Sequence, residues 1–218
     1  MLKFLRLWWH GITTRRKMNG VFSRREDPYG YCSSPYETAR LCAMEEALKG
    51  GRYAGVLEIG CAEGAFTEKL CPMASEIIAI DISPVALERA AKRVMKNQPG
   101  CTVSFMEADI RRWEPPDGKS FNAVVAADVL YYMDKPLVRK EFMEVLEKIR
   151  CWVVPGGTLM LAHGFANSEE KKIRQGYRKK FEEMGLGLVS EKVVGDEVRD
   201  KVCCLLSMLK RGNEPLIR

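Results

Sequence analysis

Short apolar runs alternate with amphipathic stretches along most of the chain after residue 30. The apolar runs predict strands at 54–59, 76–81, 102–107, 121–127, 158–163, 186–194 and 202–209. Apolar residues spaced by three and four positions predict helices at 35–49, 64–71, 84–96, 135–152 and 168–184. Turn residues separate these elements at 97–101, 114–120 and Pro155-Gly156-Gly157.

This order of elements predicts the class of fold. Strands that alternate with crossover helices form a parallel sheet with helices on both faces. The connection at 195–201 is too short for a crossover, so the last two strands should form an antiparallel hairpin. We therefore expect an α/β, Rossmann-like seven-stranded sheet with five parallel strands and a C-terminal antiparallel hairpin. A nicotinamide-binding dehydrogenase would instead continue with parallel strands.

The positive charge of the chain is concentrated at its beginning. The net charge is +6, yet residues 1–25 carry seven basic and no acidic side chains, which leaves −1 for the rest. The segment opens MLKFLRLWWHG, where Lys3 and Arg6 interrupt the apolar stretch and no small-residue cleavage site follows, unlike a signal peptide. This composition favours a flexible extension over 1–26, or a start codon upstream of a working one at Met18. A short basic helix on a membrane surface or protein partner is the alternative.

The remaining organisation follows from the pattern and composition. We expect an N-terminal helix or lid segment at 27–53, the main domain at 54–211 and a tail at 212–218. Hydrophobic residues make up 46% and charged residues 29%, as in globular proteins, and no apolar run approaches the roughly 20 residues of a membrane span. The eight cysteines include no C-x-x-C pair and no Cys/His cluster, which argues against a metal site and favours reduced thiols in the cytoplasm.

The stretch VLEIGCAEGAF places a carboxylate, Glu58, in an apolar strand just ahead of a glycine turn. An unpaired buried charge is unfavourable, so Glu58 must meet a partner in the protein or a ligand. A dinucleotide site would read G-x-G-x-x-G, whose amides bind a pyrophosphate. Here Gly60, Ala62 and Gly64 follow the acid at alternate positions, and a carboxylate so near the turn would repel phosphate and attract a cation.

Two more acids end the next two strands. Asp81 follows Gly60 by 21 residues, where an acid typically binds ribose hydroxyls. Asp109 follows the third strand, where it could accept a hydrogen bond from an adenine amino group. A ligand with a cationic amino-acid end, a ribose and an adenine, but no phosphate, suits all three acids. That ligand is S-adenosylmethionine.

On these residues the sequence resembles the class I S-adenosylmethionine-dependent methyltransferases over roughly 54–209. The resemblance implies a donor-binding loop formed by Glu58, Gly60, Cys61, Ala62 and Gly64, although Ala62 departs from the commoner middle glycine. It also implies that Asp81 binds the ribose, that Asp109 contacts the adenine amine, and that Ile82 and Ile110 flank the adenine ring.

A narrower resemblance rests on DPYGYCSSPYE at 27–37 and DVLYYM at 128–133. These stretches are similar to the nodulation protein S group, whose members N-methylate the amino sugar of a chitin-like oligosaccharide. The resemblance covers about 27–165 and guides the layout of the site more than the substrate. It implies a small-molecule amine acceptor. O-methylation of a small natural product, or a non-catalytic protein that binds the donor or a partner, are the alternatives.

Five residues are candidates for the acceptor side. Asp128 ends the fourth strand, where the family places a residue facing the donor or acceptor, although it could instead cap the next turn. His163 ends the fifth strand and is either a general base or a buried structural histidine. Tyr131 and Tyr132 are substrate walls or packing residues, and Tyr36 is a lid residue or a helix start.

Nucleic acid is the competing acceptor. Methylation of a base amine usually goes with Asn/Asp-Pro-Pro-Tyr after the fourth strand, whereas this chain has Asp-Val-Leu-Tyr at 128–131. Basic residues cluster at 171–180, but glutamates frame them, which indicates a solvated helix face with charge pairs. A nucleic-acid substrate is therefore disfavoured, and no oligomeric state follows from the sequence.

Overall fold

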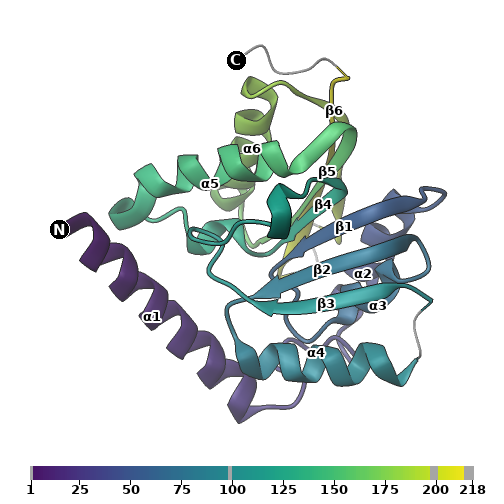
Figure 1. Ribbon diagram of the computed structural model, residues 1–218, viewed down its shortest axis with the longest axis horizontal. Coiled ribbons are helices and arrows are strands. Elements are labelled where there is room, and N and C mark those ends of the chain that lie inside the picture. Colours follow the sequence, from purple (N-terminus) through teal and green to yellow (C-terminus); the bar gives the residue numbers. More distant parts are fainter. Residues whose placement is uncertain (1, 98–99, 197–200, 214–218) are drawn as a thin grey trace.

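The computed structural model describes residues 2–97, 100–196 and 201–213. Within these residues, seven strands form one sheet in the order β3-β2-β1-β4-β5-β7-β6 (Figure 1). The strands are β1 (Tyr53–Ile59), β2 (Ala74–Asp81), β3 (Thr102–Glu107), β4 (Phe121–Ala127), β5 (Val153–Phe165), β6 (Leu186–Val194) and β7 (Cys203–Arg211). β1 to β5 pair in parallel, and β7 runs antiparallel to both β5 and β6. The predicted mixed sheet is confirmed.

The helices are α1 (Leu2–Arg24), α2 (Pro35–Leu48), α3 (Ala65–Leu70), α4 (Pro84–Lys96), α5 (Arg139–Trp152) and α6 (Ser168–Glu183). Side-chain caps fix several of the helix starts. Ser34, Ser83 and Asn167 each accept a hydrogen bond from the backbone three residues on, at the starts of α2, α4 and α6. No described helix combines the length and apolarity that a membrane span requires.

The helices cover both faces of the sheet. One core lies between the sheet and α2, α3 and α4, with Met44, Phe66 and Leu87 among its members. The other lies between the sheet and α5 and α6, where Phe142 and Phe181 are buried. Apolar side chains on both faces of the central strands produce this three-layer arrangement.

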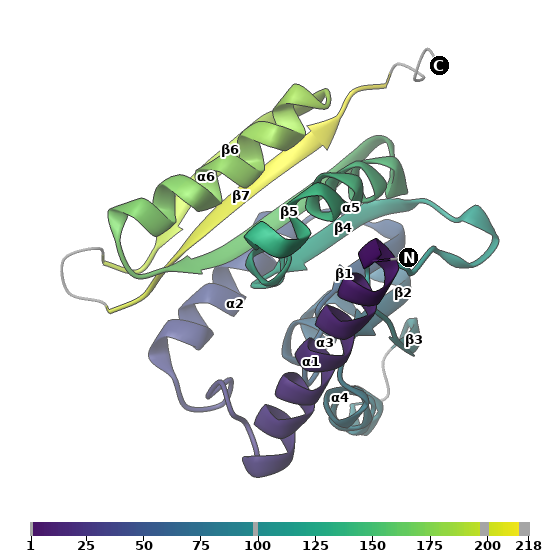
Figure 2. The ribbon, with the colours of Figure 1, turned by 90° about the vertical axis from the view of Figure 1, so that its left-hand side faces the viewer.

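α1 crosses the carboxyl edge of the sheet, as Figure 2 shows. The sequence favoured a flexible extension for this segment, whereas the structure has a helix that packs with one of its faces against the rest of the protein. Phe22 is fully buried, the Ser83 hydroxyl donates to Asn19 Oδ1 at 2.6 Å, and Arg15 pairs with Glu107 at 2.5 Å. Met1 and residues 214–218 of the expected tail lie outside the described residues, as do the side chains of residues 2–8.

β5 begins earlier than the sequence predicts. The run Pro155-Gly156-Gly157 was expected to be a break, yet β5 passes through it because Val153 already pairs with Phe121 of β4. The register shifts between Phe121 and Ala123, and Gly156 has a φ of +72°, so the break is absorbed as an irregularity within the strand. α5 begins at Arg139 rather than at residue 135, after a 3₁₀ turn that contains Pro136.

Candidate active site

A cavity of about 390 Å³ opens at the carboxyl edge of the sheet. Strand-end residues and the inner face of α1 both line it. The strand-end residues are Gly60, Asp81, Asp109 and Asp128, and those of α1 are His10, Thr14, Met18 and Phe22. The volume lies within the range of small-molecule sites, and this edge of a parallel sheet is where such sites form.

The loop between β1 and α3 is held by backbone conformation. Gly60, Ala62 and Gly64 have φ values of +76°, +47° and +75°. A Cβ on Gly64 would lie 2.9 Å from the Cβ of Ala90 and 3.0 Å from its Cα, so only glycine lets the loop approach α4. Ala62 adopts a left-handed conformation that costs most residues about 1–2 kcal/mol. The strain is offset where the Ala62 amide donates to Asp81 Oδ2 at 3.0 Å.

Glu58 has a partner inside the protein. The Thr67 hydroxyl donates to Glu58 Oε2 at 2.6 Å, and Glu58 is only 3% exposed. Burial raises the pKa of Glu58 to about 8. Among the described residues of this loop, Gly60 and Ala62 line the cavity, whereas Glu58, Cys61 and Gly64 are not part of its lining.

Asp81 lines the cavity in a fixed orientation. Besides the Ala62 amide, it accepts the Ser83 amide at 2.8 Å on Oδ1. Burial raises the pKa of Asp81, and these backbone hydrogen bonds oppose the rise. Each oxygen keeps a further lone pair that a ligand hydroxyl can use. Ile82 and Ile110 also line the cavity and add apolar surface to it.

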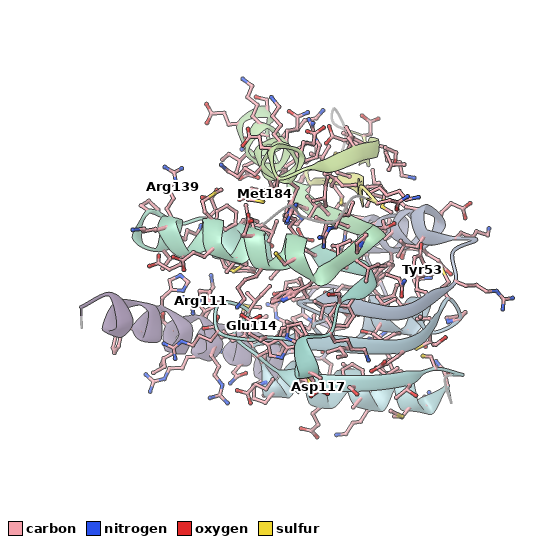
Figure 3. All side chains as sticks on the ribbon, turned by 45° about the horizontal axis from the view of Figure 1, so that its top comes forward. Tyr53, Arg111, Glu114, Asp117, Arg139 and Met184 are labelled. Carbon is pink, nitrogen blue, oxygen red and sulfur yellow. The ribbon has the colours of Figure 1, made fainter. Side chains whose placement is uncertain are left out.

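Asp109 lines the cavity as part of an ion-paired network that reaches α1. Arg111 donates to Asp109 from Nε at 2.8 Å and from Nη2 at 2.5 Å. Nη1 of Arg111 lies 2.8 Å from Nδ1 of His10, which places Arg111 beside α1 (Figure 3). Burial, followed by the charge of Arg111, lowers the pKa of His10. The loop after β3 is thereby tied to α1.

Asp128 lines the cavity at the end of β4, with a φ of +51°. The Gly164 amide donates to Oδ1 at 2.7 Å, and Arg40 Nη1 lies 3.3 Å from Oδ2. Arg40 is 4% exposed, lines the cavity and also donates to Glu37 at 2.6 Å. Although burial opposes its charge, Asp128 and Glu37 raise the pKa of Arg40. The Gly164 amide and Arg40 therefore fix the orientation of the Asp128 carboxylate.

Aromatic side chains surround the rest of the cavity. The tyrosines that line it are Tyr29, Tyr31, Tyr36, Tyr131 and Tyr132. The Tyr36 hydroxyl is buried without a hydrogen-bond partner among the described residues, which leaves it free to bind a ligand. The Arg174 guanidinium lies 4.7 Å from the ring centre of Tyr131 and donates from Nε to the Gly164 carbonyl at 2.9 Å.

His163 lies behind this aromatic wall. It is 2% exposed and is absent from the cavity lining among the described residues. Its ring meets those of Tyr131 and Tyr177 edge-on, with ring centres 6.3 Å and 5.6 Å away. Burial lowers the pKa of His163 to about 4. The imidazole is therefore neutral at physiological pH and separated from the cavity by Tyr131.

The buried His163 predicts a pH effect on stability. Below pH 6.5, His163 binds a proton in the unfolded chain, whereas in the folded protein it stays neutral down to about pH 4. Protonation therefore favours the unfolded chain, and the free energy of unfolding falls as the pH falls through this window. Between pH 7 and 5, the wild type should lose about 2 kcal/mol more unfolding free energy than His163→Phe. Urea denaturation at both pH values measures this. Equal losses in the two proteins would contradict the burial of an uncharged imidazole.

Several cavity residues were missed from the sequence. Arg40 and Arg174 had no motif to mark them, because each acts through partners distant in the chain. The inner face of α1 did leave a signal, since residues 10, 14, 18 and 22 recur at helical spacing. That spacing would have predicted a helix with one buried face.

Sequence comparison finds relatives over the same region. The profile of the nodulation protein S (NodS) family matches residues 21–178. Nodulation protein S of Rhizobium tropici is 34% identical over 136 residues, which cover 62% of this chain and 54% of that protein. Malonyl-[acyl-carrier protein] O-methyltransferase of Halalkalibacterium halodurans is 33% identical over 112 residues, 49% of this chain and 38% of that protein. The chain spans about half the length of the curated nodulation proteins it matches.

A solved structure extends the likeness beyond the matched region. The N-methyltransferase NodS from Bradyrhizobium japonicum WM9, in complex with S-adenosyl-L-homocysteine, superposes with a TM-score of 0.76 at 25% identity. The superposition covers 91% of this chain and 98% of that one. The family profile covers well over half of the chain and includes the strand-end acids of the cavity. The chain belongs to the nodulation protein S (NodS) family.

Proposed function

We propose that this protein transfers a methyl group from S-adenosylmethionine to an amine of a small acceptor, such as an amino sugar. The observation that carries the proposal is the cavity formed where β2, β3 and β4 end, into which Asp81, Asp109 and Asp128 all open. The NodS relative of similar structure is an N-methyltransferase crystallised with the spent donor. That likeness supports both the donor and the nitrogen acceptor.

The donor half of the cavity suits an adenosine. Both oxygens of Asp81 are oriented by backbone amides and can accept the two ribose hydroxyls. Ile82 and Ile110 offer flat apolar walls for an adenine ring, and Asp109 retains lone pairs for its amino group beside Arg111. Gly60 lines the cavity with a positive φ, and a Cβ there would lie 3.3 Å from the Cβ of Val129.

The protein's main task in this chemistry is alignment. When bound, S-adenosylmethionine supplies a methyl group already activated by the positive sulfur. The side chains then have to hold donor and acceptor in line and keep water out, which can lower the barrier by about 7–11 kcal/mol. α1 covers the adenosine half, and the tyrosine walls enclose the other half, so both requirements are supported by the cavity's construction.

Asp128 is better placed than His163 to serve the acceptor. An amine must present its lone pair, so it has to arrive neutral or lose a proton. Asp128 borders the cavity and can accept a hydrogen bond from the amine, while Arg40 and the Gly164 amide keep its carboxylate in position. His163 lies behind Tyr131 and supports that wall.

Activity screening with radiolabelled donor tests the proposal. The acceptors are a chitooligosaccharide with a free amine on its terminal sugar, simple amino sugars, small amines, phenols and carboxylic acids. We expect label in the amines. Label only in phenols or acids would make the protein an O-methyltransferase, as the Halalkalibacterium relative is. Binding of S-adenosylhomocysteine with no transfer to any acceptor would indicate a non-catalytic donor-binding protein.

Asp128→Asn should separate catalysis from donor binding. Asparagine tolerates the left-handed backbone at this position but cannot accept a proton, so we expect kcat to fall about 100-fold or more. The dissociation constant for S-adenosylhomocysteine should stay within about threefold, or 0.7 kcal/mol. Asp117→Asn, an exposed left-handed aspartate remote from the cavity, is the matched control and should leave both values unchanged. An Asp128→Asn enzyme with full kcat would exclude a role in transfer.

A further inference from the structure

From Trp9 to Arg24, where its side chains are described, α1 contacts the body of the protein through one face. Residues 10, 14, 18 and 22 face the cavity, and Arg15 and Asn19 bind Glu107 and Ser83. The helix contains no acidic residue. The residues on the other face of the helix therefore need not serve the cavity.

That other face combines an exposed aromatic ring with unpaired positive charge. Trp9 is 59% exposed, the largest exposed fraction among the aromatic side chains given for the described residues. Arg16, Lys17 and Arg24 are exposed as well. No described carboxylate lies within ion-pair distance of Arg16 or Arg24, unlike Arg15, which pairs with Glu107. Trp9, Arg16 and Arg24 are named here as the outer face of α1. Lys17 lies instead beside the cavity, with its amine 6.0 Å from the ring centre of Tyr132.

The neighbouring surface adds to this charge. The positive charge of Lys135 is close enough to His10 to lower its pKa, after the larger effects of burial and Arg111. Arg139 points outward at the start of α5, on the side toward which the N-terminal end of α1 extends (Figures 1 and 3). Two acids beside α1, Glu107 and Asp109, are already paired with arginines. This edge is positive, whereas the chain after residue 25 is close to neutral.

We propose that the outer face of α1 binds an anionic lipid surface, with the helix lying in the plane of the headgroups. Basic residues are attracted by anionic lipids, and tryptophan prefers the boundary between headgroups and acyl chains. A lipid surface suits both features of this face, its positive charge and the exposed indole of Trp9.

Sedimentation with large vesicles tests the proposal on the full-length protein. Vesicles of phosphatidylcholine alone are compared with vesicles containing roughly one-third phosphatidylglycerol, at about 0.1 M and about 1 M salt. We expect binding to the anionic vesicles at low salt and strong loss at high salt. Arg16→Gln with Arg24→Gln should weaken that binding on the order of tenfold, and Trp9→Ala should weaken it too.

The control is Lys172→Gln with Lys179→Gln, which removes two exposed charges from α6, far from α1 (Figure 1). If both double variants lost vesicle binding equally, binding would depend on net charge alone, and the assignment to α1 would be overturned. Absence of binding to anionic vesicles, or tight binding of a single-stranded oligonucleotide in its place, would overturn the lipid surface. The affinity for S-adenosylhomocysteine should be unchanged in these variants, so this proposal and the proposed function fail independently.

Discussion

Asp81→Asn is expected to weaken the binding of S-adenosylhomocysteine about 100-fold or more. Asp81 has its two oxygens fixed by the amides of Ala62 and Ser83. Hydrogen bonds to a charged group contribute about 1.5–3 kcal/mol each, and the asparagine would lose such bonds to the ribose. Its amide nitrogen would also face one of the two backbone N–H groups. Isothermal titration calorimetry measures the change.

Asp117→Asn is the matched control for this prediction. It makes the same change of charge and shape at an exposed site, on the turn Pro116–Gly118, and should leave the dissociation constant unaltered. Thermal unfolding of both variants confirms that the proteins compared are folded. An Asp81→Asn protein that is folded and binds S-adenosylhomocysteine like the wild type would show that the donor lies elsewhere, and the proposed function would fail with it.

Gly64→Ala is expected to lower the free energy of unfolding by about 3 kcal/mol or more. A left-handed conformation costs a residue with a Cβ about 1–2 kcal/mol, and the new methyl would press on the Cα and Cβ of Ala90 in a closely packed core. Neither group can rotate away, because one is backbone and the other has no torsion. Urea denaturation measures the loss.

Gly176→Ala is the same chemical change, but it should raise the free energy of unfolding instead of lowering it. Gly176 lies within α6, has no positive φ, and a Cβ added there meets nothing within 4 Å. Alanine is the better helix former, so this variant should gain about 0.5–1 kcal/mol of stability. If Gly64→Ala left the free energy of unfolding unchanged, the loop would have to relax away from α4. The geometry of the loop would then not be fixed by the contact of Gly64 with Ala90.

Elements with strong local signals were located closely from the sequence. Ser83 and Pro84 gave the start of α4, and β3, β4 and β6 have the bounds that their apolar runs predict. α1 was different, because an acid-free, basic composition is typical of a solvated extension. Its helix is held by tertiary contacts, chiefly the burial of Phe22, and the signal that was overlooked is the helical spacing of the four residues that line the cavity.

In the candidate site, too, some features could be predicted from the sequence and others could not. Carboxyl ends of parallel strands share an edge, so Glu58, Asp81 and Asp109 were expected together around the donor. Asp81 and Asp109 do line one cavity, together with Asp128, whereas Glu58 is not part of its lining. The direction of individual side chains was harder to predict. Neighbouring strand residues point to opposite faces, which puts His163 toward Tyr177 of α6 while Gly164 meets the cavity. Arg40 was not predicted because Asp128, the partner that links it to the cavity, lies far along the chain, just after β4.

The position of β7 has a consequence for the order in which the protein can be assembled on the ribosome. β6 is made first but touches the sheet only through β7, which lies between it and β5. A nascent chain that has emerged as far as Val194 therefore presents an unpaired edge on β5 and a strand with no neighbour. Both gain their partner at once when Cys203–Arg211 emerges, so the sheet is completed in a single step.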